Sequence, residues 1–515
     1  MRLTASVILS LLLVAVPARA EWRRAESPNF VLYGNLSEQA LRQRILLLED
    51  FDRLLRTITS VQEAPSPNRL HVYIVTGPRQ LRAIRNLPSD VAGFYTATAE
   101  GIAAVVDGSS GMGNQVLFHE YAHHFMLQHR PNAYPAWYVE GFAEYFMTVR
   151  FAAQYIDVGD ASRARAAWLL NARWLPMARV ISGDRRLSRE ETALFYAQSW
   201  LLIHYFYSNP ERQAALRRYL AAARRDSPAA ALLAATGFTP DRLDTELANY
   251  IRRGTIRIRR MTRASDAVRP AVMVNALSPG ADAAIADAAA LRIGVGDEAA
   301  PALLGRLRAA AARFPNDPFV SRTLAYAEAI HGDGAAADRL LDPLLAANPN
   351  DAELMYLRGR RYLSAAQQEG APPDAMRSAR QWFSRAHRAD GNHFQTLYRY
   401  IDSLKDEPGY ISENSANVLL LAHQLAPQVH EITMTAAWML LRRGNRAEAA
   451  SLLEPLAADP HNRGLAQAAS EMLAEARGEA PVTSSSQPPA TPEEPQPYSV
   501  RGRRKNLLFA TAQSR

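Results

Sequence analysis

The segment Phe118-His-Glu-Tyr-Ala-His-His124 has residue types and a spacing that suit a metal ion. His119 and His123 are four residues apart, so on a helix their imidazoles project from the same face, one turn apart. Two imidazoles in this arrangement can bind one tetrahedral ion at ~2.0 to 2.1 Å. Glu120 would then lie beside the ion, where its carboxylate can hold a water molecule rather than the ion itself.

The helix predicted over residues 115–128 is apolar nearly all round, which is typical of a buried helix. Burying two histidines and a glutamate without partners would cost several kcal/mol. Either a metal ion or a hydrogen-bond network must therefore compensate for their burial. Because H-E-x-x-H arises by chance in on the order of 1% of chains of this kind, a satisfied cluster without metal remains the alternative.

A second predicted helix, beginning at Pro135, supplies carboxylates at a matching spacing. Glu140 and Glu144 are four residues apart on a strongly apolar stretch, so both project from one side of the helix. In a zinc site Glu140 would be the third ligand, and Glu144 would accept the N–H of a ligand imidazole. Gly141 would let helices approach closely. The sequence thus predicts one zinc ion per chain.

The two helices resemble those of gluzincin zinc metallopeptidases, in particular the bacterial peptidase-MA-like group. In this group H-E-x-x-H is often followed by W-x-x-E-G-x-A, which stands here as Trp137-Tyr-Val-Glu-Gly-Phe-Ala143. The resemblance covers about residues 25–250 and implies a zincin-like fold that hydrolyses peptide bonds. It also implies that His119, His123 and Glu140 bind zinc and leave a fourth position for water. Glu120 would be the general base and acid.

A further stretch of the chain is similar to the same group. Phe195-Tyr-Ala-Gln-Ser-Trp200 matches a segment found downstream of the zinc motif in these peptidases. Tyr196 is therefore the candidate donor to the oxyanion of the tetrahedral intermediate. A tyrosine packed in the core, without a catalytic role, is the alternative for this residue.

Residues 21–255 are predicted to form the α+β domain that positions these side chains. A helix is expected at residues 38–55, and strands at residues 29–33, 70–75 and 101–106. The strand at 101–106 is expected at a sheet edge, where it can pair with an extended substrate. Residues 252–263 alternate in the manner of a strand with one basic face.

Residues 280–477 are predicted to be all-helical and built from repeats. Pro315-Asn-Asp recurs 34 residues later as Pro349-Asn-Asp. This period resembles the tetratricopeptide repeat, whose stacked helix pairs form a concave surface for a peptide or partner protein. An unspecific helical bundle is the alternative. Residues 256–279 are predicted to be a linker, so a chain ending near residue 270 should fold and bind zinc by itself.

The two ends of the chain differ in composition from the rest. Residues 1–20 are typical of a secretory signal peptide, with an apolar run before the small-x-small pattern Ala18-Arg-Ala20. The chain has no cysteine, which excludes disulfides and thiolate ligands. We therefore expect a secreted protein of a bacterial periplasm, with no transmembrane segment after cleavage. Residues 478–515 are Pro- and Ser-rich and then basic, which predicts a disordered tail.

The formal charge of +8 falls to +6 when Arg2 and Arg19 leave with the signal peptide, and the rest is scattered. No nucleic-acid partner is therefore expected. The expected function is a zinc-dependent peptidase whose repeats recruit a peptide or protein substrate or a partner protein. The alternative is a periplasmic tetratricopeptide-repeat scaffold with a catalytically silent zincin domain. Glu120 favours the first function, because a purely structural site has no need of that carboxylate.

Overall fold

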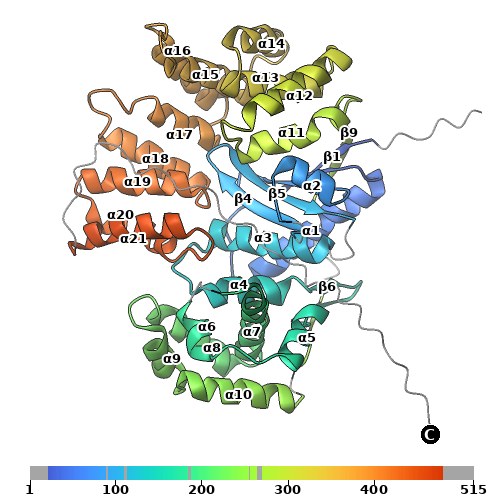
Figure 1. Cartoon of the computed structure of the whole chain (residues 1–515), viewed down its shortest axis with the longest axis vertical. Coiled ribbons are helices and arrows are strands. Elements are labelled where there is room, and N and C mark those ends of the chain that lie inside the picture. Colours follow the sequence, from blue (N-terminus) through green and yellow to red (C-terminus); the bar gives the residue numbers. More distant parts are fainter. Residues whose placement is uncertain are drawn as a thin grey trace, which may run out of the picture.

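The structure, a computed structural model, describes residues 21–88, 91–109, 113–183, 187–254, 256–263 and 269–479. The predicted signal peptide and the tail beyond residue 479 lie outside these residues. A mixed sheet lies at the centre of the molecule, with a helical layer below it and an arc of further helices around its upper and left sides (Figure 1). No helix in the described part of the chain is long and apolar enough to cross a membrane.

The central sheet has six strands in the order β4-β5-β3-β2-β1-β9. β2, β3 and β5 are parallel, whereas β4, β1 and β9 run antiparallel to their neighbours. Their bounds are β1 Arg23–Glu26, β2 Phe30–Gly34, β3 Leu70–Val75, β4 Gly93–Thr98, β5 Gly101–Asp107 and β9 Met273–Ala276. The strands predicted at 29–33, 70–75 and 101–106 are thus confirmed as β2, β3 and β5.

β5 lies in the interior of the sheet, between β4 and β3, so the prediction that residues 101–106 form an edge strand is wrong. Every residue of β5 is buried, because helices cover both faces of the sheet. Its unbroken apolar sequence is typical of a strand covered in this way. The strand at this edge is β4, which the sequence did not predict.

Helices from both ends of the chain cover the sheet. α1 (Glu38–Thr59) and α3 (Gly113–His129) pack on one face, and α2 (Pro78–Ile84) and α11 (Ala281–Ile293) pack on the other. α1 confirms the helix predicted at residues 38–55. Because α11 belongs to the repeats, one face of the sheet is completed by the C-terminal part of the chain.

The helical layer below the sheet follows α3 in the chain. Its helices are α4 Ala136–Phe146, α5 Arg163–Asn171, α6 Met177–Ser182, α7 Arg189–Tyr207, α8 Pro210–Ala222, α9 Pro228–Thr236 and α10 Pro240–Arg252. A small antiparallel sheet joins them, with β6 Arg150–Phe151, β7 Tyr155–Val158 and β8 Arg259–Thr262. Of the strand predicted over residues 252–263 only β8 is formed, because α10 continues to Arg252.

The repeats are helical throughout, as predicted. They run from α11 to α21, through α12 Ala300–Arg313, α13 Pro318–His331, α14 Gly334–Ala347, α15 Ala352–Ala366, α16 Ala375–Ala389, α17 Phe394–Asp402, α18 Glu413–Leu425, α19 His430–Arg442, α20 Arg446–Ala457 and α21 Arg463–Arg477. The recurring Pro-Asn-Asp ends in a helix N-cap in both copies, since Asp317 caps α13 and Asp351 caps α15. The 34-residue spacing therefore marks two equivalent helix starts.

Residues 256–279, predicted to be a linker, contain the strands β8 and β9. β8 pairs with β7 and β9 pairs with β1, both antiparallel. The chain therefore returns from the helical layer to the central sheet before it enters the repeats. Both strands have four residues and no fully buried side chain. β8 lies within the stretch whose alternation predicted a strand, whereas β9 was not predicted.

The arc of repeats closes around the turn between β4 and β5 (Figure 1). Arg360 on α15 and Arg399 on α17 each donate to the carboxylate of Glu100 in that turn, at 2.7 Å. Tyr326 on α13 donates to the same carboxylate at 3.3 Å. Alternate helices of the repeats thus hold one side chain of the central sheet.

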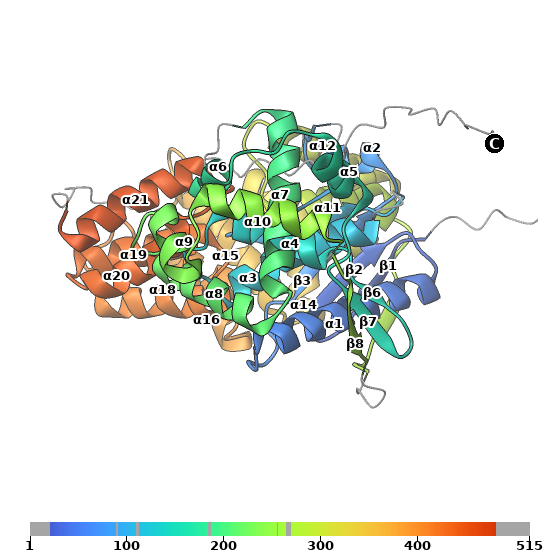
Figure 2. The same cartoon turned by 90° about the horizontal axis from the view of Figure 1, so that it is seen from below.

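The repeats make further contacts with the N-terminal part of the chain through α17 and α19. The carboxylate of Glu431 on α19 accepts a hydrogen bond from the backbone of Ala99, the residue before Glu100. Phe394 on α17 and Ile432 on α19 belong to the same buried cluster as α1 and α3. Seen from below, the last repeats, α18 to α21, lie to one side of the α3–α4 pair (Figure 2). The repeat face turned toward the sheet is therefore occupied by the chain's own N-terminal part.

A chain truncated after residue 270 should fail to fold, in contrast to the expectation from the sequence. It lacks β9 and α11, so Val31, Tyr73 and Val105 on the second face of the sheet lose their cover. Each exposed side chain of this size costs about 1.5–3 kcal/mol, and a domain has only about 5–15 kcal/mol in total. Solubility and a thermal unfolding curve check this outcome. A chain ending at residue 479 is the control and should unfold like the full protein; a soluble, cooperatively unfolding 270-residue chain would contradict the prediction.

Glu100 should make the docked repeats sensitive to acid. Burial by itself would raise its pKa, but the charges and hydrogen bonds of Arg360 and Arg399 outweigh burial and lower the pKa from 4.5 to about 2. A carboxyl group whose pKa is lower in the folded than in the unfolded state stabilises the fold at neutral pH. For Glu100 this stabilisation is on the order of 3 kcal/mol. It is lost as the pH falls from 4.5 toward 2. Glu100→Gln should therefore unfold more easily at pH 7 and approach the wild type below pH 3. Urea unfolding at several pH values measures the difference, with the exposed Glu369→Gln as control; a constant difference across pH would refute the role of this carboxylate.

Candidate metal centre

The helices α3 and α4 bring His119, His123 and Glu140 together in the interior. The Nε2 atoms of His119 and His123 lie 3.1 Å apart. Oε2 of Glu140 lies 3.7 Å from each of these two nitrogens. All three side chains are buried, and they form the group of possible metal ligands found within the described residues.

The three distances fit a tetrahedral ion. With ligand distances of 2.0 to 2.1 Å, neighbouring ligand atoms are about 3.3–3.4 Å apart. The three separations lie on both sides of this value, at 3.1, 3.7 and 3.7 Å. The donor set of two imidazoles and one carboxylate is the set that zinc accepts in open sites.

The carboxylates of this region lack protein partners that would balance them. Both oxygens of Glu140 and Oε1 of Glu120 are buried without a hydrogen-bond donor among the described residues. Glu144 is also buried there, and Arg165 is its guanidinium partner. Three carboxylates against one guanidinium leave an excess of two negative charges when all are ionised, which a divalent cation would neutralise.

The electrostatic environment keeps the two imidazoles neutral. Burial, followed by the charges of Arg165 and His461, lowers the pKa of His119 to about 3. Burial and then His119 hold the pKa of His123 well below its ordinary value. A neutral imidazole is the form that binds a metal. Burial, and then the charges of Glu144 and Glu120, raise the pKa of Glu140 well above its ordinary value, although the charge of Arg165 acts in the opposite direction.

Glu120 lies on α3 between the two histidines and faces the edge of the central sheet. The backbone of Tyr95 on β4 donates a hydrogen bond to its carboxylate. Burial raises the pKa of Glu120 to about 8, so in the metal-free protein this group can take up or release a proton close to neutral pH. Because an edge strand supplies the donor, the outer edge of β4 runs past the site.

Glu144, predicted to accept the N–H of a ligand imidazole, lies near His119. Its Oε1 lies 3.7 Å from Nδ1 of His119, which is longer than a hydrogen bond. Arg165 on α5 holds both of its oxygens, with Nε at 2.8 Å and a terminal nitrogen at 2.7 Å. Sequence reasoning missed Arg165, because α5 is separated from α4 by two strands and has no motif of its own.

Gly141 on α4 permits the close approach of another helix. That helix is α7 and not α3, which carries the two histidines. A Cβ at this position would lie 2.4 Å from the carbonyl oxygen of Ser199 on α7. Tyr196 lies one turn earlier on α7, and its ring is buried. The guanidinium carbon of Arg165 lies 5.0 Å from the centroid of this ring. The charge of Glu140 contributes to the raised pKa of Tyr196, after burial. Tyr196 is thus near the site.

His461 joins the site from the other end of the chain. Its Nδ1 lies 3.6 Å from Oε1 of Glu140, and its ring lies 5.2 Å from that of His123, measured between centroids. It stands in the turn between α20 and α21, 321 residues after Glu140 in the sequence. No spacing rule links two such positions, so only the docking of the repeats reveals the contact.

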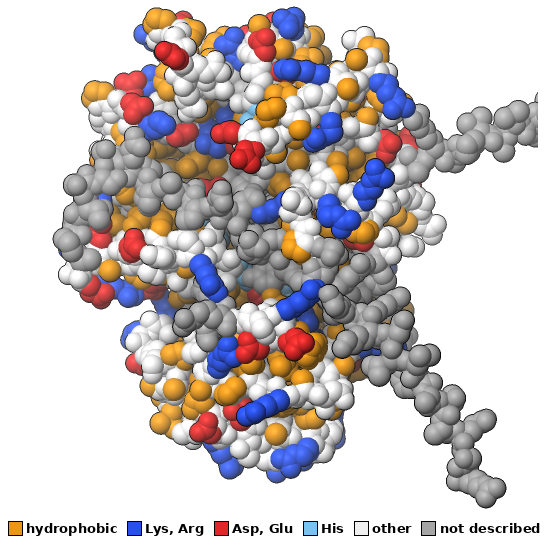
Figure 3. Space-filling view, in the orientation of Figure 1, with side chains coloured by type: hydrophobic (Ala, Val, Ile, Leu, Met, Phe, Trp, Pro, Cys, Tyr) orange, Lys and Arg blue, Asp and Glu red, His pale blue; other side chains and the backbone are white. Residues whose placement is uncertain are grey.

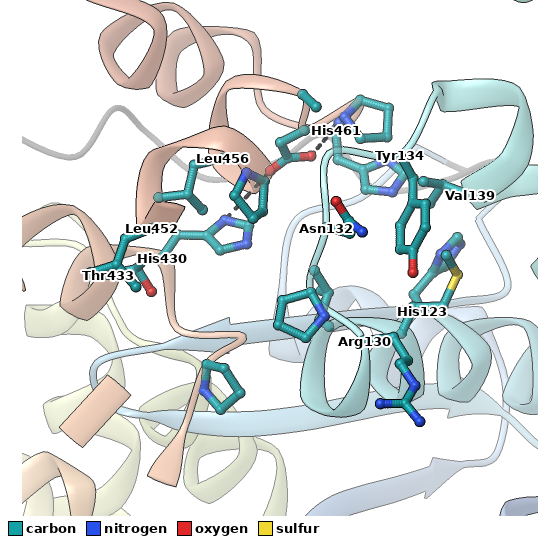
Figure 4. A pocket seen from close by; sticks show the side chains of 18 of the residues that line it. His123, Arg130, Asn132, Tyr134, Val139, His430, Thr433, Leu452, Leu456 and His461 are labelled. Atoms are coloured by element: carbon teal, nitrogen blue, oxygen red, sulfur yellow. Dashed lines mark hydrogen bonds and ion pairs between the residues drawn. The ribbon is translucent and has the colours of Figure 1, made fainter. Parts of the chain in front are cut away.

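A cavity of about 140 Å³ adjoins the site. It lies between the α3–α4 connection and the last repeats, and Figure 4 shows His123 on the right of it, His430 on the left and His461 above. Its lining is mainly apolar, with Met126, Val139 and Leu456 among the side chains. The candidate site therefore adjoins a cavity at the boundary with the repeats.

The comparisons with known proteins concern the repeats. A family model described as Tetratricopeptide Repeats-Sensor matches residues 298–404. No curated protein matches the chain. A crystal structure of a thermophilic tetratricopeptide-repeat protein from Thermus thermophilus is similar, with 18% identity, a TM-score of 0.29 and coverage of 34% of this chain and 90% of that one. By the family match, the C-terminal part of this chain contains tetratricopeptide-type repeats, a fold that commonly mediates protein interactions.

Proposed function

We propose that this chain is a zinc-dependent peptidase with a zincin-like N-terminal part. The observation that supports this proposal best is the tetrahedral spacing of His119, His123 and Glu140 in a buried, negatively charged site. Glu120 beside them is the second support. Oε1 of Glu120 is buried without a hydrogen-bond donor among the described residues. A purely structural metal site would have no need of such a carboxylate beside the ion.

The residues divide the reaction between them. When bound, zinc would act as a Lewis acid toward water and the scissile carbonyl. Glu120 takes a proton from the attacking water, whose oxygen bonds to the carbonyl carbon. Glu120 then delivers that proton to the amide nitrogen as the carbon–nitrogen bond breaks. Tyr196 is our candidate donor to the oxyanion formed between these steps.

The substrate would lie along β4, in place of the strand first expected at residues 101–106. β4 is the edge strand, and its Tyr95 backbone already contacts Glu120. An extended peptide can add to such an edge through backbone hydrogen bonds. The contact of Glu431 with Ala99 covers the far end of this strand, so a peptide would reach the site from the Gly93 end.

A second candidate function is a scaffold that binds a partner protein through its repeats. The match of residues 298–404 to a repeat family favours it. The repeat face turned toward the sheet already contacts Glu100, so a partner would bind on the outer face. On the side seen in Figure 3, acidic and basic side chains are interspersed over that outer surface. The peptidase and scaffold functions are compatible in one chain.

Removal of a ligand should remove zinc. His119→Ala, His123→Ala and Glu140→Ala should each lose most bound zinc, because each deletes one of three protein ligands. His124→Ala is the matched control: it removes an equally buried imidazole of α3, whose Nδ1 contacts the Tyr95 hydroxyl at 3.2 Å. Zinc content by atomic emission, and affinity by competition with a chelator, give the answer. Stoichiometric zinc at full affinity in Glu140→Ala would rule out the proposed ligand set.

Glu120→Gln should separate metal binding from hydrolysis. The amide keeps the size of the side chain but takes no proton, so turnover should fall by roughly 10²- to 10⁴-fold while bound zinc stays stoichiometric. Cleavage of a mixed peptide library by zinc-loaded full-length protein, followed by mass spectrometry, measures the loss. Wild-type protein stripped of zinc serves as the inactive reference. Equal turnover in Glu120→Gln and wild type would remove the base from the mechanism.

A further inference from the structure

The turn between α20 and α21 places a side chain of the repeats at the metal centre. His461 approaches Glu140 at the carboxylate oxygen that does not face the two histidines. Oε2 of Glu140 lies 3.7 Å from the Nε2 atoms of both His119 and His123, whereas Oε1 lies 3.6 Å from Nδ1 of His461. The two oxygens of Glu140 therefore face different partners.

The backbone around His461 is held on both sides. The buried carboxylate of Asp459 accepts a hydrogen bond from the His461 N–H at 2.7 Å. Directly after His461, Asn462 caps α21 by accepting from the Leu465 N–H at 3.0 Å. Asp459 also lies 3.5 Å from Nδ1 of His430 (Figure 4). The turn thus presents His461 from a defined backbone position and not from a loose loop.

The position of His461 suits an orienting contact better than direct ligation. The ligand atoms that lie within 4.8 Å of one another belong to His119, His123 and Glu140, and His461 is outside this group. Oε1 of Glu140 has no hydrogen-bond donor among the described residues, and Nδ1 of His461 lies 3.6 Å from it. The present separation is slightly longer than a hydrogen bond. A small approach on metal binding would let an imidazole with its proton on Nδ1 donate to this oxygen and turn Oε2 toward the ion.

We propose that His461 is a positioning residue of the metal centre, which holds Glu140 in the orientation that binds the metal. This inference rests on the proposed function, because it presumes a metal at His119, His123 and Glu140. It assigns the repeats a part in building the site. Metal affinity then depends on whether the last repeat is docked, so anything that displaces α20 and α21 weakens the site.

The test is the affinity of the full-length protein for Zn²⁺ and the visible absorption of its Co²⁺ form. His461→Ala should weaken Zn²⁺ binding by ~10- to 100-fold, the usual effect of losing a partner of a ligand. His461→Asn carries an amide N–H close to the position of Nδ1 and should restore most of the affinity. His461→Gln carries its amide farther out, near Nε2, and should restore less. The Co²⁺ spectrum should keep the same coordination number in all variants.

His430→Ala is the matched control, because His430 lines the same cavity and contacts Asp459 but none of the three ligands. It should bind Zn²⁺ like the wild type. Equal thermal stability of the metal-free variants shows that the turn still folds. Unchanged Zn²⁺ affinity in His461→Ala, with zinc bound normally by the wild type, would overturn the positioning role alone. A changed Co²⁺ coordination number in His461→Ala would also overturn it, because it would make His461 a ligand. Absence of metal in the wild type would instead overturn the proposed function.

Discussion

The burial of Glu100 between Arg360 and Arg399 is the interaction on which the placement of sheet and repeats depends. A buried carboxylate is stable only with paired charges, and here both guanidinium groups come from repeat helices while the carboxylate comes from the sheet. The carboxylate thus obtains its two ionic partners only when sheet and repeats are packed together. The contact lies at the turn that ends β4, so it also fixes the edge strand whose Tyr95 backbone contacts Glu120. The β4–β5 hairpin therefore connects the contact between sheet and repeats with the candidate site.

The candidate metal site also contains buried charged groups, but there the negative groups are in excess. At Glu100 two cations surround one anion, whereas at Glu140 the carboxylates outnumber the single guanidinium of Arg165. Protons or a divalent cation must make up the difference. Neutral imidazoles at His119 and His123 cannot do so. This imbalance, more than the motif itself, is the physical reason for placing a metal ion there.

The fold of the repeats alone indicates a surface for a partner protein, but in this chain the repeats pack against the N-terminal part. Stacked helix pairs commonly offer a concave surface to a partner, yet the face turned toward the sheet is filled by the chain's own hairpin and core. α11 covers the sheet, α13 to α19 hold the hairpin, and the turn before α21 reaches Glu140. The outer face of the repeats stays available to a partner in the proposed scaffold function. If His461 positions Glu140 as proposed, a partner that moved the last repeat would act on the candidate metal site.

The sequence by itself determined the local features: the i, i+4 pairs of His119 with His123 and of Glu140 with Glu144, the buried strands β2, β3 and β5, and the 34-residue helical period. These follow from helix and strand geometry, which acts over a few residues. The tertiary structure alone decided which strand forms the edge, that residues 256–279 complete two sheets, and that Arg165 and His461 join the site. These contacts join residues up to several hundred positions apart, and they depend on the packing of whole layers. No local pattern of residue types encodes such contacts.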